Sequence, residues 1–158
     1  MKAEKWYNKA GNIFEEESMK GCIATNFESG FLFSNASGTY ALFIPGYSAY
    51  STIWDKEARK SNTLRILYEK TRENAKLATE NASGYCSDRA CKVREFKNET
   101  TTVYVYEKLL RMFPKNALFY ISERHAPVMV GIWENDRLYE IGLVMPLYTQ
   151  GNFKADSK

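Results

Sequence analysis

The chain has 158 residues, a formal net charge of +3 and a single histidine. This length suffices for one domain whose core needs neither disulfides nor a metal. The charge is far below the dense basic surface of a dedicated DNA-binding protein, and the sequence has no glycine-rich phosphate loop and no apolar run long enough to span a bilayer. Eleven tyrosines and nine phenylalanines favour sheets and interaction surfaces over a helical bundle.

The N-terminal segment predicts one helix and three strands. Trp6, Ala10 and Phe14 recur at helical spacing and give residues 2–16 an apolar face. Short runs rich in aromatic and aliphatic residues follow, separated by residues that favour turns. We therefore expect strands over residues 21–26, 30–34 and 39–44.

The middle of the chain predicts a loop and a long helix. Aromatic and small residues after the third strand indicate a packed loop, in which Tyr47, Tyr50 and Trp54 are candidate partner-binding residues. Apolar residues then recur with a helical period over residues 62–82, which predicts a helix of about five turns. The helix belongs to an insertion at about residues 55–84. Its outer face mixes both signs of charge, as solvated helix faces usually do.

The C-terminal third predicts an antiparallel sheet. Residues 101–106 alternate as a strand does, and Leu109, Leu110 and Phe113 then recur at helical spacing until Pro114 ends a short helix. Three apolar runs joined by short polar turns favour a meander over parallel strand–helix–strand units. These runs cover residues 117–122, 128–133 and 138–147.

Together these elements predict an α+β fold with an antiparallel sheet, helices packed on one face and the long helix inserted between strands. Residues 1–150 form a single domain, and the polar residues 151–158 are expected to be a frayed tail. The N-terminal residues are amphipathic and charged instead of forming an apolar leader, so we expect a cytoplasmic protein.

Catalytic and metal-binding patterns are weak. Cys86 and Cys91 are close in sequence and Cys22 is remote, whereas zinc needs about four ligands and only His125 is available beside them. His125 falls in a predicted turn, where an exposed imidazole is usual, and the acidic residues are dispersed. We therefore expect a non-enzyme with no cofactor and no metal. An enzyme that uses His125 or a cysteine is a further hypothesis, ranked behind the two functions given at the end of this subsection.

Basic residues recur on the two shorter predicted helices. Lys108, Arg111 and Lys115 lie at three-to-four spacing after the strand at 101–106, and Lys5 and Lys9 lie on the first helix. Helices with such outer faces can rest against phosphates without reading bases, and this binding weakens as salt rises. An ordinary solvated surface is the more common reason for such charges, so both interpretations stay open.

The C-terminal third resembles part of one domain of a bacterial DNA sliding clamp, and the first third does so loosely. The likeness lies in four segments: YEKLLRMFP from Tyr106, LFYIS from Leu118, APVMV from Ala126 and GLVMPL from Gly142.

The resemblance implies helices that face DNA inside a ring and a terminal Met-Pro strand that helps to form a peptide-binding pocket. Lys108 and Arg111 would face the duplex, and Met145, Pro146 and Leu147 would be partner-binding residues. A clamp subunit joins two or three such domains, whereas this chain has one.

Two leading functions from different classes follow. The first is a non-enzymatic, clamp-like interaction module that contacts a protein partner and the backbone of duplex DNA. The alternative is a small phage or mobile-element inhibitor or accessory protein that docks on a host enzyme through the aromatic loop and the long helix. A homo-oligomer is a further alternative, and no membrane partner is expected.

Overall fold

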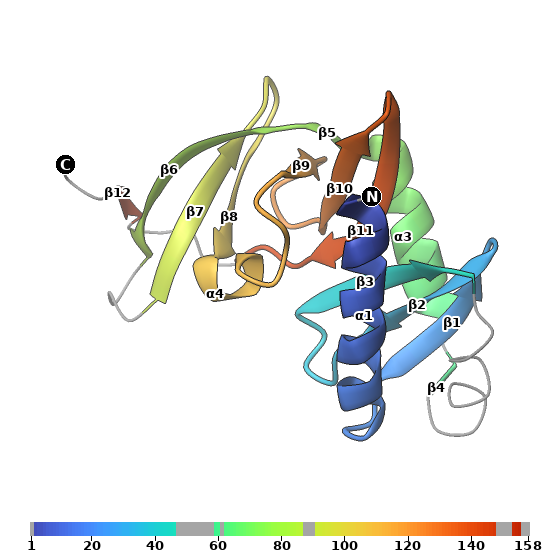
Figure 1. Cartoon of the computed structure of the whole chain (residues 1–158). Coiled ribbons are helices and arrows are strands. Elements are labelled where there is room, and N and C mark those ends of the chain that lie inside the picture. Colours follow the sequence, from blue (N-terminus) through green and yellow to red (C-terminus); the bar gives the residue numbers. More distant parts are fainter. Residues whose placement is uncertain (1, 47–58, 61, 87–90, 148–152, 156–158) are drawn as a thin grey trace.

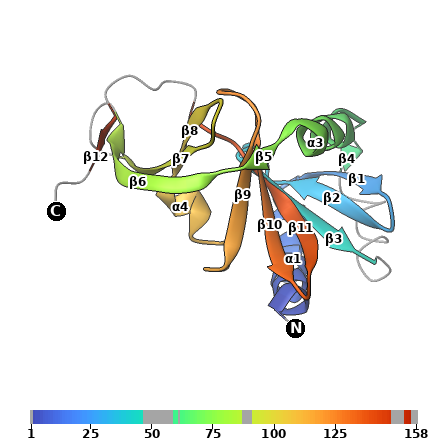
Figure 2. The same cartoon turned by 90° about the horizontal axis from the view of Figure 1, so that it is seen from above.

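The computed structural model describes residues 2–46, 59–60, 62–86, 91–147 and 153–155. Within these residues the chain is an α+β protein with two sheets that lie side by side (Figures 1 and 2). No helix in the described ranges is long and apolar enough to cross a membrane. The helices are α1 (Lys2–Ser18), α3 (Asn62–Asn74) and α4 (Glu107–Leu110).

The larger sheet contains the first three strands and the C-terminal meander. Its strand order is β4-β1-β2-β3-β11-β10-β9-β5, and every neighbouring pair is antiparallel except β1 and β4. The predicted meander is therefore confirmed, and β11 continues it onto β3. The strands are β1 (Ile23–Phe27), β2 (Gly30–Ser34), β3 (Tyr40–Pro45), β4 (Arg59–Lys60), β5 (Lys76–Leu77), β9 (Ala117–Ile121), β10 (Val128–Glu134) and β11 (Arg137–Val144).

The smaller sheet has the order β12-β6-β7-β8, with antiparallel pairs throughout. Phe96, Val103 and Val105 from this sheet join the same apolar core as Phe14 and Phe31. The two sheets therefore share one core. The strands are β6 (Thr79–Cys86), β7 (Cys91–Lys97), β8 (Thr102–Tyr106) and β12 (Lys154–Ala155).

Helices cover both faces of the larger sheet, so the prediction that they pack on one face is wrong. Every residue of β2 is buried. Phe31 and Phe33 contact Phe14 of α1, whereas Leu32 belongs to a second apolar cluster with Tyr68 of α3. Because side chains alternate between the faces of a strand, a strand that is apolar at consecutive positions needs a cover on each side.

The predicted long helix is also wrong, because α3 ends at Asn74 and the chain continues as β5 and β6. This extended segment leaves the larger sheet and enters the smaller one (Figure 1). The residues after Ala75 suit either form, although Thr79 and Asn81 are poor helix formers. Pairing of β5 with β9 and of β6 with β7 decides in favour of strands. The partner β9 is far along the chain, whereas β6 and β7 form a local hairpin.

Two turn and bend positions explain the shape of the meander. Asn135 and Asp136 both have positive φ, at 53° and 58°, as a tight two-residue hairpin requires. Gly142 lies where β11 meets β3, and a Cβ there would come within 2.3 Å of the Ala41 carbonyl oxygen. Glycine is therefore needed at residue 142 for the backbones to approach.

Arg72 fastens α3 to the larger sheet. Its guanidinium lies 2.6 Å from the Glu28 carboxylate and 2.8 Å from the Glu140 carboxylate. It also stacks over the Phe27 ring, at 4.8 Å from the centroid, and over Tyr68. The Arg72 side chain is only 34% exposed, so these contacts are partly shielded from water. One arginine thus fixes where the helix lies on this face.

We predict that Arg72→Ala lowers the free energy of unfolding by about 2 kcal/mol, because it removes charge-assisted hydrogen bonds and leaves Glu140 without this partner. Chemical denaturation measures the change. Arg65→Ala is the matched control, since Arg65 is exposed on the same helix, and its effect should stay within about 0.5 kcal/mol. Equal losses in both variants would contradict this role.

A second prediction concerns alkaline pH. Tyr7 donates a hydrogen bond to the Glu140 carbonyl oxygen at 2.9 Å, and burial raises the pKa of Tyr7 from 10.0 to about 12. A phenol that holds its proton more tightly when folded stabilises the fold below pH 10.0 and loses this contribution as the pH rises toward about 12.

Stability should therefore fall across that pH interval. Urea denaturation at a series of pH values should show that the free energy of unfolding falls less steeply with pH in Tyr7→Phe than in the wild type. Some fall should remain in the variant. Tyr40 and Tyr120 also have raised pKa values because they are partly buried. An identical pH slope in the wild type and Tyr7→Phe would refute the assignment.

Candidate functional site

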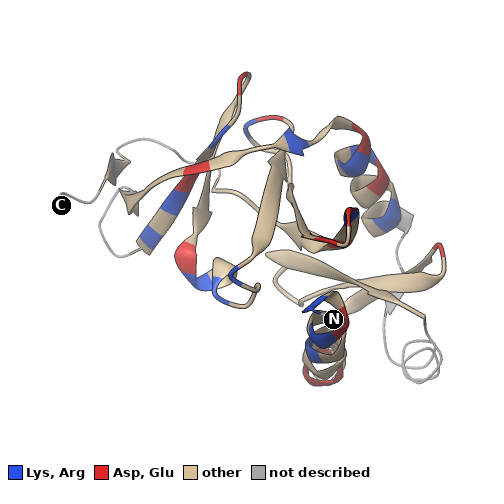
Figure 3. Cartoon of the chain, turned by 45° about the horizontal axis from the view of Figure 1, so that its top comes forward, with Lys and Arg blue, Asp and Glu red and all other residues tan. Residues whose placement is uncertain are grey.

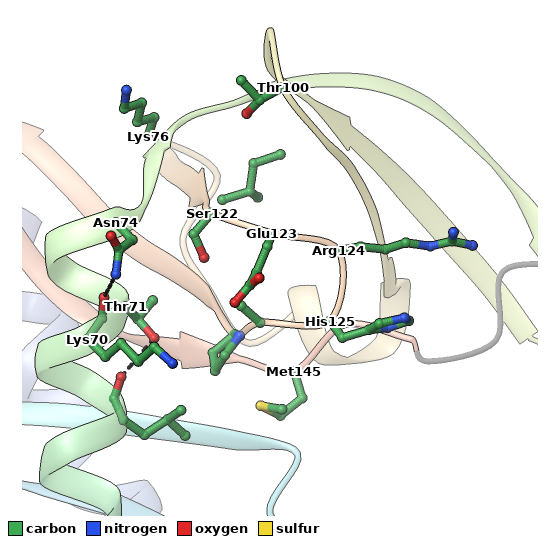
Figure 4. A pocket seen from close by; sticks show the side chains of 14 residues that line it. Lys70, Thr71, Asn74, Lys76, Thr100, Ser122, Glu123, Arg124, His125 and Met145 are labelled. Atoms are coloured by element: carbon green, nitrogen blue, oxygen red, sulfur yellow. Dashed lines mark hydrogen bonds between the residues drawn. The ribbon is translucent and has the colours of Figure 1, made fainter.

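The described residues include two surface regions that combine a hollow with charged side chains. The first, which we call the cleft, lies between α3, β5 and the loop that joins β9 to β10 (Figure 4). Its volume is about 1090 Å³. Its lining residues come from five separate stretches of the chain: Leu67, Lys70, Thr71, Asn74, Lys76, Thr100, residues 121–127 and Met145.

Asn98 holds three of the cleft walls in place. Its side-chain oxygen accepts hydrogen bonds from the Thr100 and Thr101 amides, each at 3.0 Å. Its side-chain nitrogen donates to the Ile121 carbonyl at 3.3 Å and more weakly to the Lys76 carbonyl at 3.5 Å. This one residue therefore ties the β7–β8 turn to β9 and β5. The Asn98 side chain therefore fixes this part of the rim through hydrogen bonds to backbone groups.

Charges of both signs face the cleft. Lys70, Lys76 and Arg124 are the cations, and Glu123 is the only carboxylate among the described lining residues. Figure 4 shows Lys70 and Glu123 directed into the hollow from opposite sides, with Ser122 beside Glu123. The Lys76 and Arg124 side chains are directed away from this pair, so the two charges that face each other in the hollow are of opposite sign (Figure 4).

The cleft adjoins a small apolar side pocket of about 190 Å³. Leu67 and Met145 line both hollows and form the boundary between them. The side pocket lies between α3 and the larger sheet. Its other apolar lining residues are Ile23, Tyr40, Ala41, Leu64 and Leu143.

The second region, which we call the groove, runs between the β2–β3 turn and α4. It consists of two hollows of about 750 and 490 Å³ that share Ser37, Thr39, Tyr106 and Leu109. One end is apolar and contains the predicted partner-binding residues Met145, Pro146 and Leu147. The other end is charged and contains Cys91, Lys92, Glu107, Lys108 and Arg111.

Backbone hydrogen bonds position the apolar end of the groove. The Met145 amide donates to the Thr39 carbonyl at 2.9 Å, and the Leu147 amide donates to the Tyr104 carbonyl at 2.8 Å. The segment after β11 thus bridges the two sheets. Leu147 is buried against Val93, so it shapes the groove wall more than it offers contact area.

Glu107 organises the charged end. Its side chain is 13% exposed and lies 3.2 Å from Arg94, 3.6 Å from Arg111 and 4.0 Å from Lys92. A carboxylate shared by three cations is already neutralised by the protein itself. Lys108 extends the positive charge beyond this network on an exposed side chain.

The predicted DNA-contact residues are partly brought together. Lys9 donates to the Met112 carbonyl at 2.9 Å, and Trp6 contacts Phe113, so α1 lies against the segment after α4. Figure 3 shows Lys and Arg positions on α1 and around α4, with Asp and Glu positions among them, and α3 likewise carries both signs. Lys9 and Arg111 are thus engaged with protein groups. All five members of the predicted set are nevertheless exposed, and the Arg111 side chain is 73% exposed even within its ion pair.

The structure does not bring the remaining candidate site residues together. Tyr47, Tyr50 and Trp54 lie outside the described residues. His125 lines the cleft, whereas Cys91 lines the groove, so these two do not share a hollow. Burial raises the pKa of the Cys22 thiol to about 11, which makes it a poor nucleophile. No cluster of three or more potential metal ligands occurs among the residues that the structure describes.

The sequence reasoning missed the cleft. Lys70 was assigned to a solvated face, and Glu123 to a turn, because each is unremarkable in its own segment. The one sequence feature that pointed to this cleft was the strongly charged turn at residues 123–126. No local pattern says that α3 lies opposite that turn.

Comparisons with known proteins give no match. No protein-family model fits the chain, and neither a curated protein nor a solved structure is detectably similar. The likeness to a sliding-clamp domain therefore rests on the four short segments alone.

We predict that Asn98→Ala lowers the free energy of unfolding by about 1–2 kcal/mol, because backbone amides lose their acceptor. Hydrogen exchange should also speed up at the Thr100 and Thr101 amides. Asn12→Ala is the control, since Asn12 is exposed on α1 and alanine is the better helix former. Unchanged exchange at the β7–β8 turn would contradict the role of Asn98.

Proposed function

We propose that the chain is a non-enzymatic interaction module that binds a segment of a protein partner in the groove. The observation that carries the proposal is the shared position of two sets of residues. Met145, Pro146 and Leu147 were singled out by the clamp resemblance, and Lys108 and Arg111 by their charge and by the same resemblance. These five residues line two hollows that adjoin through Tyr106 and Leu109.

The lining of the groove indicates the chemistry of the occupant. The apolar end suits a leucine, methionine or phenylalanine side chain as an anchor. At the other end, three cations (Lys92, Arg94 and Arg111) lie around Glu107. Lys108 adds an exposed charge beyond them, and Glu80 is a second carboxylate, 3.3 Å from Arg94. An acidic side chain beside the apolar anchor would complement this excess of positive charge. The proposed occupant is therefore a short acidic peptide segment with one or two apolar residues.

Fluorescence polarisation with short synthetic peptides tests this proposal. Peptides with a Leu-Phe pair flanked by aspartate and glutamate should bind, and peptides with the same pair flanked by lysine should not. Lys108→Glu should weaken binding roughly tenfold, because it reverses a charge at the groove and adds like-charge repulsion.

The matched control is Lys115→Glu. Lys115 is equally exposed and lies shortly after the same helix, but it does not line the groove. Its reversal should change affinity by no more than about twofold, since salt screens distant charges. The proposal fails if acidic and basic peptides bind alike, or if the two reversals have the same effect.

The duplex-DNA part of the clamp hypothesis receives less support. Two of its five cations, Lys9 and Arg111, already contact protein groups. A steep loss of affinity for duplex DNA between low and moderate salt is the measurement that would favour it. The phage-inhibitor alternative relies on the loop at residues 47–54, which lies outside the described residues, and on the long helix, which ends at Asn74. A tight stoichiometric complex with one host enzyme would favour that alternative.

A further inference from the structure

The apolar side pocket lies beside the groove, and of its described lining residues only Gly38 and Met145 also line the groove. Its floor is formed by direct cross-strand partners in four neighbouring strands, β1, β2, β3 and β11. These partners are Ile23, Ser34, Ala41 and Leu143. Residues directly opposite each other in an antiparallel pair share one face of the sheet, so the four side chains form one row beneath α3.

The side pocket is a consequence of residue size in that row. Ser34 and Ala41 occupy its middle, and their short side chains leave space below α3. Leu64 and Leu67 of α3 form the opposite wall. Further along the same helix, the ion pairs of Arg72 fix where α3 lies on the sheet. The hollow is therefore built by the fold and not by the rotamer of one side chain.

The lining of the side pocket excludes a charged ligand. No charged side chain occurs among its described lining residues, and an ion buried without a partner is strongly disfavoured. Its hydroxyl groups belong to Ser34, Tyr40 and Thr63. Ser34 donates to the Asn35 carbonyl oxygen at 3.4 Å. Tyr40 donates to the Glu17 carboxylate at 3.3 Å. Two of the three hydroxyls are thus directed to protein acceptors, and the lining suits an uncharged, largely apolar ligand.

The volume of the side pocket sets the size of this ligand. The pocket measures about 190 Å³, and an apolar cavity of roughly 150 Å³ holds one benzene molecule. One six-membered ring with a small substituent therefore fits. A flat ring suits the space between a helix and the sheet beneath it, and the thioether of Met145 at the boundary can make favourable contacts with a ring edge.

We propose that the side pocket binds a small uncharged molecule that carries a single aromatic ring. The ring lies between α3, at Leu64 and Leu67, and the row of residues in the larger sheet. The molecule enters from the cleft past Leu67 and Met145, which line both hollows.

Methyl NMR of the full chain, with labelled isoleucine, leucine and methionine, tests the proposal with toluene as the probe. Toluene should bind with a Kd below about 1 mM and should shift the methyl signals of the pocket lining. These signals belong to Ile23, Leu64, Leu67, Leu143 and Met145. Ile66 and Met19 are the controls, because both side chains are exposed, and their signals should not move. If toluene leaves the pocket signals unchanged, or shifts the exposed ones equally, the proposal is overturned.

Two further probes test the chemistry of the ligand. Benzoate has the same ring as toluene but carries a charge that the side pocket cannot pair, so it should bind at least about tenfold more weakly. Equal affinities of the two molecules would refute an apolar site. Toluene should bind equally well when the acidic Leu-Phe peptide is present. Displacement of toluene by that peptide would assign the side pocket to the peptide contact and would overturn the small-molecule site.

Ala41→Leu locates the binding, because it fills the middle of the floor and should weaken toluene binding at least about tenfold. Ile66→Ala is the matched control, since Ile66 precedes Leu67 on the same helix but is 58% exposed and does not line the pocket. Its affinity for toluene should equal that of the wild type. Unchanged affinity in an Ala41→Leu variant that folds by circular dichroism would refute the site.

Leu67→Ala keeps the test decisive if Ala41→Leu does not fold. Leu67 is only half-buried, so its truncation should be tolerated. The loss of this side chain widens the hollow and should raise the affinity for naphthalene relative to toluene by at least about threefold. An unchanged ratio of the two affinities would contradict binding beside Leu67.

Discussion

The larger sheet is apolar on both faces, and this constraint governs the rest of the structure. Phe31 and Phe33 point to one side of β2 and Leu32 to the other, so neither face can be left in water. The chain meets this demand with α1 on one face and α3 on the other. The cleft exists because α3, held by Arg72, stops short of the β9–β10 loop and leaves space between them.

The second sheet follows from the same demand. One face of β7 and β8 supplies Phe96, Val103 and Val105 to the core beside α1. The chain enters this sheet from β5 and leaves it through α4, and after β11 it returns to bridge both sheets at residues 145–147. The groove lies along this return path. Its apolar end is therefore part of the structural connection between the sheets and not an appendage.

Local sequence patterns predicted the parts of the fold that depend on local physics. The period-two strands, the apolar face of α1 and the turn at Asn135 and Asp136 all follow from residue type and spacing. The end of α3 did not, because residues 76–77 become a strand by pairing with β9, far along the chain, and β6 then pairs with the next strand, β7. The sequence pointed to Met145 and Lys108 as candidates, but it did not show that they line adjoining hollows. Lys70 and Glu123 face each other only after folding.

The edges of the larger sheet have a consequence for self-association. Its outermost strands, β4 and β5, contain two residues each as described, and β12 at one edge of the smaller sheet is equally short. The opposite edge strand, β8, already accepts a hydrogen bond from Leu147. Short or occupied edges offer few backbone groups for another copy to extend. Subunits of this protein that meet would do so through side-chain surfaces, and a continuous sheet across their boundary is disfavoured by the architecture itself.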